Sequence, residues 1–126
     1  MPQNYTYPTK TKADSLTVVP NYGQELTNRN KTNFIISFKY KLHNKFNFDK
    51  MDINNLKQFQ NFLDKVSKMT FNQVDKEFLC TNDKKDTFKG IQIIHYVVNK
   101  KFRIHGIIED GRFKVLRMDP NHDVHN

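Results

Sequence analysis

The stretch FRIHGIIEDGRFKVLRMD, residues 102–119, decides the fold. Asp110-Gly111 lies near its centre, and this dipeptide is the strongest short hairpin signal because a type I′ turn needs positive φ at both central residues. The flanking residues are rich in apolar side chains that suit a pleated strand. We therefore predict two antiparallel strands, over residues 102–109 and 112–119, joined by a two-residue turn.

The turn also predicts which residues share a face of the sheet. It places Glu109 opposite Arg112, and opposed residues point to the same side. One side then carries Phe102, Ile104, Ile108, Phe113 and Val115, and we expect it to pack on helices. The other side carries Arg103, His105, Glu109, Arg112 and Lys114, with Ile107, Leu116 and Met118 among them. This register puts Arg117 on the apolar side, so its side chain must reach the sheet edge or the register must slip.

Two helices are predicted between residues 52 and 79. Apolar residues recur at helical spacing from residue 52 to residue 68, and Asp52 is a favourable N-cap. The sequence Thr70-Phe71-Asn72-Gln73 is typical of a capping box, in which Thr70 caps the helix and Gln73 reaches back. A short second helix is expected to run from there to about residue 79.

The remaining elements complete an α+β domain. Residues 33–40 alternate between apolar and polar with the period of a half-buried strand, and residues 91–98 form an apolar, β-branched run. Residues 80–89 are polar, and we expect a loop there. The predicted order is β-α-α-β-β-β, with two helices on one face of a mostly antiparallel sheet.

The length of 126 residues fits one domain and is too short for two. Residues 1–31 contain three of the four prolines, and many Asn and Thr residues interrupt any period. We expect residues 1–31 to form an irregular N-terminal arm and residues 32–126 to form the compact domain.

The net charge is the main compositional clue to a partner. Lys and Arg number 21 against 13 Asp and Glu, which gives +8. Such a net charge on a small domain attracts polyanions, although it does not distinguish nucleic acid from anionic lipid or an acidic protein. Abundant Lys and Asn are also typical of an AT-rich genome, so part of the charge has a compositional explanation. The polar sheet face has two possible interpretations. It suits RNA, with its cations against phosphates and its apolar groups under bases. Alternatively, it is simply solvated, and its charges pair across strands.

The sequence favours a cytoplasmic protein. Cys80 is the only cysteine, so no disulfide can form within the chain, which fits a reducing compartment. No apolar run approaches the 18 or so residues of a membrane span, and no signal peptide opens the chain. We expect no membrane partner.

The closing hairpin and the element order resemble the RelE/YoeB family, small bacterial toxins that cut mRNA on the ribosome. The resemblance covers about residues 33–124. It implies a RelE-like fold, a metal-independent endoribonuclease, Arg103 as the phosphate-binding arginine and His122 in the place of the terminal catalytic histidine. It also implies mRNA on the ribosome as substrate and a cognate antitoxin or inhibitor protein as partner. For the family's catalytic carboxylate, the matching loop offers Asp83 and Asp86.

The segment Asp119-Pro120-Asn121-His122 is also similar to the ends of uncharacterised proteins of bacterial and mobile-element origin. No known activity comes with that second resemblance.

Metal-free RNA cleavage needs a base, an acid and cations, and histidine and arginine side chains suit these roles. Our candidate catalytic residues are Arg103, His122 and His105. Our candidate RNA-binding residues are Arg112, Lys114, Lys101 and Arg117. Each of the three catalytic candidates also has a structural explanation. His122 could cap a turn, His105 could form a hydrogen bond with a neighbouring residue, and Arg103 could pair with an acidic residue.

Two functions remain open from the sequence. One is the endoribonuclease, and the other is a non-catalytic module that binds nucleic acid or protein in a phage or mobile-element conflict. A metal site built on His122, His125 and Cys80 or His105 is disfavoured because no paired cysteines support it. Glycine-rich phosphate loops and nucleophile elbows are lacking too. We therefore expect neither a metal nor a cofactor.

Overall fold

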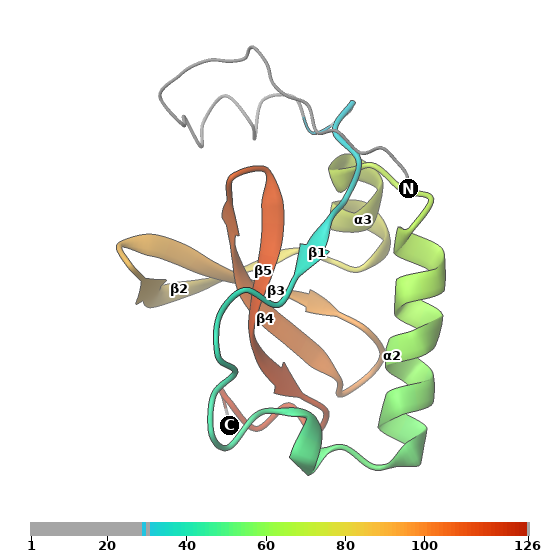
Figure 1. The fold of residues 1–126 in the computed structure, drawn as a ribbon, viewed down its shortest axis with the longest axis vertical. Coiled ribbons are helices and arrows are strands. Elements are labelled where there is room, and N and C mark those ends of the chain that lie inside the picture. The colour runs from blue at the N-terminus through green and yellow to red at the C-terminus, as the bar shows by residue number, and fades with distance from the viewer. Residues whose placement is uncertain (1–28, 30, 126) are drawn as a thin grey trace.

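A computed structural model describes residue 29 and residues 31–125 of the chain (Figure 1). The elements are β1 (Ile36–Ser37), the 3₁₀ turn η1 (Phe48–Lys50), α2 (Ile53–Val66), α3 (Phe71–Glu77), β2 (Thr81–Phe88), β3 (Ile91–Val97), β4 (Arg103–Glu109) and β5 (Arg112–Asp119). The predicted arm over residues 1–31 lies almost wholly outside the described residues. Within the described part, no helix combines the length and apolar character needed to cross a membrane.

The sheet is open and has five strands in the order β1-β5-β4-β3-β2. β1 pairs with β5 in parallel, and the other neighbours are antiparallel. The predicted α+β class, with two helices and a mostly antiparallel sheet, is confirmed. Figure 1 shows α2 and α3 together on one side of the sheet, where Phe62 and Val74 join Ile104 and Phe113 in one apolar core.

Both helices begin at the predicted caps. The Asp52 carboxylate accepts the backbone N–H of Asn55 at 2.9 Å. The Thr70 hydroxyl accepts the N–H of Gln73 at 3.3 Å, and the Gln73 side chain accepts the N–H of Thr70 at 2.8 Å. Helices this short are marginal alone, so their stability comes mainly from the face packed on the sheet.

Residues 80–89 are not the predicted loop, because residues 81–88 form strand β2. Their sequence, TNDKKDTF, has few residues that favour strands, which is why it resembles a loop. β2 lies at the edge of the sheet, where one neighbour is enough and polar side chains can face water. The element order therefore has one more strand than predicted. Conversely, the strand predicted over residues 33–40 is reduced to Ile36–Ser37.

The β4–β5 turn has the predicted conformation, with positive φ at Asp110 (56°) and Gly111 (73°). The predicted register holds from Glu109↔Arg112 to the pair Gly106↔Val115. It then shifts by one residue at a bulge, so that His105 pairs with Arg117. The bulge moves Arg117 to the His105 face of the sheet, and Met118 to the helix-covered face, where it is buried. The prediction that Met118 lies on the polar face is therefore wrong.

The face opposite the helices has a small apolar cluster of its own. Its buried members are Ile93, Ile107 and Leu116, and the half-buried Tyr40, Phe88 and Ile91 pack against them. Lys114 is only 3% exposed on this face, and its ammonium group lies 2.8 Å from Glu109 Oε1 and 3.0 Å from Asp110 Oδ2. Burial alone would lower the pKa of Lys114, but the hydrogen bonds to Glu109 and Asp110 raise it.

Replacing Lys114 by methionine is expected to lower the free energy of unfolding by about 1–3 kcal/mol near neutral pH, because Glu109 loses a charged partner. Hydrogen bonds from Lys114 and Tyr40 hold the pKa of Glu109 below its usual range. The contribution of this pair is therefore present above the unfolded pKa of about 4.3 and is lost as the pH falls through the folded value. Urea titrations between pH 3 and pH 7 should show the difference between wild type and Lys114→Met shrinking at the acid end. A difference that stays constant would contradict the pairing, and Lys57→Met on exposed α2 is the control.

Candidate functional site

An irregularity in β2 creates the most distinctive polar site. Asn82 pairs with Ile94 and Thr87 pairs with Gln92, so residues 83–86 of β2 lie opposite a single residue of β3. Such a bulge bends a strand and re-aims its side chains. The site it creates is on the sheet face away from the helices. Asp83 is 6% exposed there, although the next two residues along the chain are exposed lysines.

Three histidines converge on the Asp83 carboxylate. His95 Nδ1 lies 2.5 Å from Oδ1, His105 Nδ1 lies 2.6 Å from Oδ2, and His125 Nε2 lies 3.4 Å from Oδ1. His95 and His105 are a cross-strand pair of β3 and β4, which places both rings on the same face with centroids 5.0 Å apart. We call Asp83, His95, His105 and His125 the histidine cluster.

Arg117 borders the histidine cluster because of the bulge in β5. Its Nη2 atom lies 3.4 Å from Asp83 Oδ2 and 3.2 Å from Asp86 Oδ2. The guanidinium group is therefore shared between two carboxylates of β2. A substrate phosphate would have to compete with both of them for this cation.

The charge state of the cluster follows from its burial and hydrogen bonds. Burial alone would raise the pKa of Asp83, but hydrogen bonds from His105 and His95 hold that pKa well below its usual range. Asp83 is thus an anion, and His95 and His105 each donate to it through Nδ1–H. Burial lowers the pKa of His105 more strongly than Asp83 raises it, so the fully buried His105 ring is neutral at pH 7. Its Nε2 atom has no hydrogen-bond partner.

A pocket of about 650 Å³ opens beside the cluster. Its lining residues are Asn82, Asp83, Lys84, Lys85, Asp86, His95, His122 and His125. The two exposed lysines and three imidazoles make it a surface that suits an anion. Within the described residues, the hydrogen bond of the His95 ring is the one between Nδ1 and Asp83, and the residue lines the pocket.

The buried Asp119 shapes the turn that carries the last two histidines. Its carboxylate accepts the N–H of Asp123 at 2.8 Å and that of Val124 at 3.0 Å. His122 has the left-handed backbone conformation, with φ of 57°. This turn brings His122 and His125 to the same pocket.

The residues singled out as catalytic from the sequence lie in two places. His105 is in the cluster and His122 lines the pocket. Arg103 instead donates from Nη1 to the carbonyl oxygens of Asn99 and Lys100, both at 3.0 Å. Within the described residues, no hydrogen bond joins Arg103 to His122.

The four predicted RNA-binding residues are also dispersed. Arg117 is at the cluster, whereas Lys114 is buried in its ion pairs. Arg112 donates to the carbonyl oxygen of Asp110 at 3.0 Å, and Lys101 is exposed in the turn between β3 and β4.

Sequence reasoning missed His95 as a site residue and gave Asp83 no firm role. His95 lies inside an apolar run that reads as a buried strand, and only its pairing with His105 reveals its partners. The polar segment of residues 80–89 offers Asp83 and Asp86 as acids, but a loop there does not predict the burial of Asp83.

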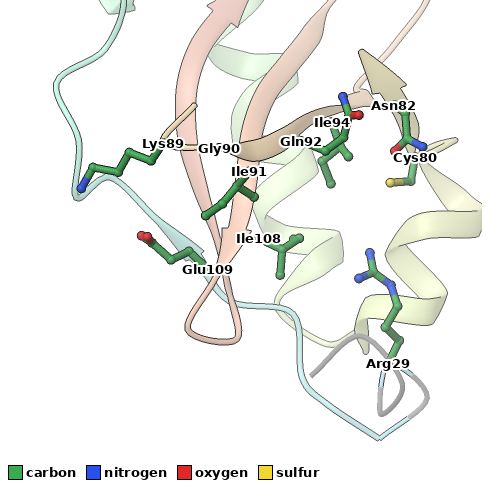
Figure 2. A pocket seen from close by; sticks show the side chains of 10 residues that line it. All are labelled: Arg29, Cys80, Asn82, Lys89, Gly90, Ile91, Gln92, Ile94, Ile108 and Glu109. Atoms are coloured by element: carbon green, nitrogen blue, oxygen red, sulfur yellow. The ribbon is translucent and has the colours of Figure 1, made fainter. Parts of the chain in front are cut away.

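A larger pocket of about 1070 Å³ lies elsewhere, and it is mainly apolar (Figure 2). Figure 2 shows Arg29 and Cys80 at one end of it and Lys89 and Glu109 at the other, with isoleucines between. Arg29 is held by the Asp75 carboxylate. Burial, with the charge of Asp75 nearby, raises the pKa of the Cys80 thiol to about 11. The thiol is therefore protonated at neutral pH, and this pocket offers no activated nucleophile.

Comparisons with protein-family models, with curated proteins and with solved structures found no match to this chain.

Proposed function

We propose that this chain is a metal-independent endoribonuclease whose active site is the pocket beside the histidine cluster. The observation that carries the proposal is that His95 and His122 line one pocket together with Lys84 and Lys85. Two imidazoles and two ammonium groups are the chemical groups that RNA transesterification needs.

His95 is the proposed general base. Its Nδ1–H donates to an ionised carboxylate, which fixes the ring and leaves the Nε2 lone pair to accept a proton. In RNA cleavage that proton comes from the ribose 2′-hydroxyl, whose oxygen then attacks the adjacent phosphorus. Asp83 acts as a positioning residue for His95.

His122 is the proposed general acid. An imidazolium there would protonate the departing 5′ oxygen, while Lys84 and Lys85 balance the charge that develops on the phosphorane. The bond from phosphorus to the 5′ oxygen breaks as the bond to the 2′ oxygen forms. The products are a 2′,3′-cyclic phosphate and a 5′-hydroxyl, and no water or metal ion enters this step.

The substrate and partners of this proposal come from the resemblance to RelE/YoeB toxins. We propose that the RNA is mRNA on the ribosome and that a cognate antitoxin or inhibitor protein restrains the enzyme. The charge of +8 supports a polyanionic substrate.

The test is cleavage of end-labelled RNA by the full chain in excess EDTA, with and without translating ribosomes. We expect discrete cuts that leave 2′,3′-cyclic phosphate ends. The double variant Lys84→Ala/Lys85→Ala should bind RNA more weakly, and its salt slope should fall by about 1.4, which is about 0.7 per lost phosphate contact. Lys57→Ala/Lys65→Ala on α2 makes the same charge change outside the pocket, and it should leave cleavage unchanged.

Failure of this test would be informative. Absent cleavage, together with salt-sensitive RNA binding that needs Lys84 and Lys85, would overturn the nuclease in favour of the non-catalytic binding module. Absence of both cleavage and RNA binding would also reject the binding module for nucleic acid, and a protein partner would remain.

A further inference from the structure

We infer that Asp83, His105 and His125 form a binding site for a divalent transition-metal ion such as Zn²⁺ or Co²⁺. One donor atom from each of these residues lies within 4.8 Å of the other two. The residues come from β2, β4 and the segment after β5, so the site depends on the folded chain and not on a local sequence motif.

The spacing of the donor atoms suits such an ion. Metal–ligand distances near 2.1 Å place tetrahedral ligand atoms about 3.4 Å apart. His125 Nε2 already lies 3.4 Å from Asp83 Oδ1. His105 Nδ1 lies 2.6 Å from the other oxygen of that carboxylate, Oδ2, so an ion that uses one oxygen requires a small shift of the Asp83 side chain or of the His105 ring. Imidazole nitrogens with one carboxylate oxygen are ligands that Zn²⁺ and its first-row neighbours prefer.

A second, independent observation is the unpartnered Nε2 of the fully buried His105. It lies 3.8 Å from Asp119 Oδ2. If Nδ1 binds a metal ion, the ring proton moves to Nε2 and can be donated to Asp119. That arrangement is the usual one for a metal-bound histidine, whose other nitrogen donates to a carboxylate. Metal binding would thus supply the hydrogen bond that this nitrogen otherwise lacks.

The buried and half-buried charges beside the donor atoms also favour a cation. Asp83 and Asp119 are buried and Asp86 is half-buried, and Arg117 is the one partly buried cation in contact with two of them. Among the buried and half-buried groups, three carboxylates and one guanidinium sum to −3 + 1 = −2; the exposed Lys84 and Lys85, which line the same pocket, are not in this sum. Arg117 Nη2 lies 3.3 Å from the proposed ligand atom His105 Nδ1, so it must move away from that atom when an ion binds, and Asp86, at 3.2 Å, can keep it. His125, which is 39% exposed, leaves an entry path from solvent.

The consequence for activity rests on the proposed function, whereas the binding itself does not. An ion bound to Asp83 and to His105 Nδ1 replaces the hydrogen bond between these two residues and draws negative charge from the carboxylate that holds His95. A bound metal ion is therefore expected to inhibit RNA cleavage, and EDTA is expected to restore it.

The experiment titrates the full chain with Co²⁺ and follows both its visible absorption spectrum and the heat of binding. We expect one ion per chain. His125→Ala and Asp83→Asn should each weaken Co²⁺ binding by at least about tenfold. His122→Ala removes a histidine from the same turn and should leave the affinity unchanged within about twofold. Because His125 is exposed, its variant should fold even where Asp83→Asn does not, and circular dichroism checks this.

Two results would overturn the inference. One is the absence of Co²⁺ binding at millimolar concentrations, and the other is equal loss in His122→Ala and His125→Ala, which would indicate a solvent-exposed histidine pair. Neither result concerns cleavage measured in EDTA, so the metal site and the nuclease stand or fall separately.

Discussion

Alanine at His95 is expected to lower the rate of RNA cleavage by about 10²- to 10⁴-fold, which is the usual contribution of a general base or acid. The same loss is expected for His122→Ala, because each histidine handles a different proton of the same step. The measurement is the single-turnover rate constant for cleavage, on the substrate and in the EDTA buffer given above.

A matched control is His43→Ala. His43 is exposed and does not line the proposed active-site pocket, so its variant should cleave RNA at the wild-type rate. His95→Ala with full activity would remove the proposed base. Full activity of His122→Ala, with activity lost in His95→Ala, would show that His122 is not the general acid. His125 would then be the next candidate for that role.

Alanine at Gly106 is expected to destabilise the domain by about 3 kcal/mol or more, at the upper end for overpacking. A Cβ atom at this position would lie 2.3 Å from the backbone oxygen of Lys114 and 2.9 Å from the ring of Phe113. The backbone oxygen belongs to the neighbouring strand, so it cannot move aside without disturbing the β4–β5 ladder. The measurement is the midpoint of urea unfolding followed by circular dichroism.

Gly90→Ala is the matched control for this substitution. Nothing lies within 4 Å of a Cβ atom there, but φ is +77°. The expected cost is therefore the strain of a left-handed residue alone, about 1 kcal/mol. Similar losses in both variants would mean that β4 and β5 can separate at the bulge without a large penalty.

The fold was predictable from sequence where local chemistry decides the structure. The caps at Asp52 and Thr70 and the turn at Asp110-Gly111 each depend on a few neighbouring residues, and each was located correctly. β2 was missed because its residues do not favour strands, and they adopt this conformation only because β3 offers an edge to pair with. The bulge at Leu116 has no such local signal, so the predicted register failed beyond Gly106.

The histidine cluster was only partly predictable for the same reason. His105 and His122 were candidates because their residue type suits proton transfer. Their relation to Asp83, His95 and His125 depends on two strand irregularities, one in β2 and one in β5, that pattern analysis does not reveal. The polar sheet face predicted from alternation has an apolar cluster at its centre. Lys114 on that face forms ion pairs with Glu109 and Asp110.

The parallel pairing of β1 with β5 has a consequence for how the chain assembles. Ile36 pairs with Phe113, 77 positions later (113 − 36 = 77), whereas each strand from β2 to β5 pairs with the next one along the chain. Closing short connections comes before closing long ones, so the β2–β5 meander should form first and β1 should join it afterwards. Phe34, whose ring contacts those of Phe62, Tyr96 and Phe113, can complete the aromatic core only at that stage. Among the strands of the described residues, the one that is synthesised first is thus expected to pair last.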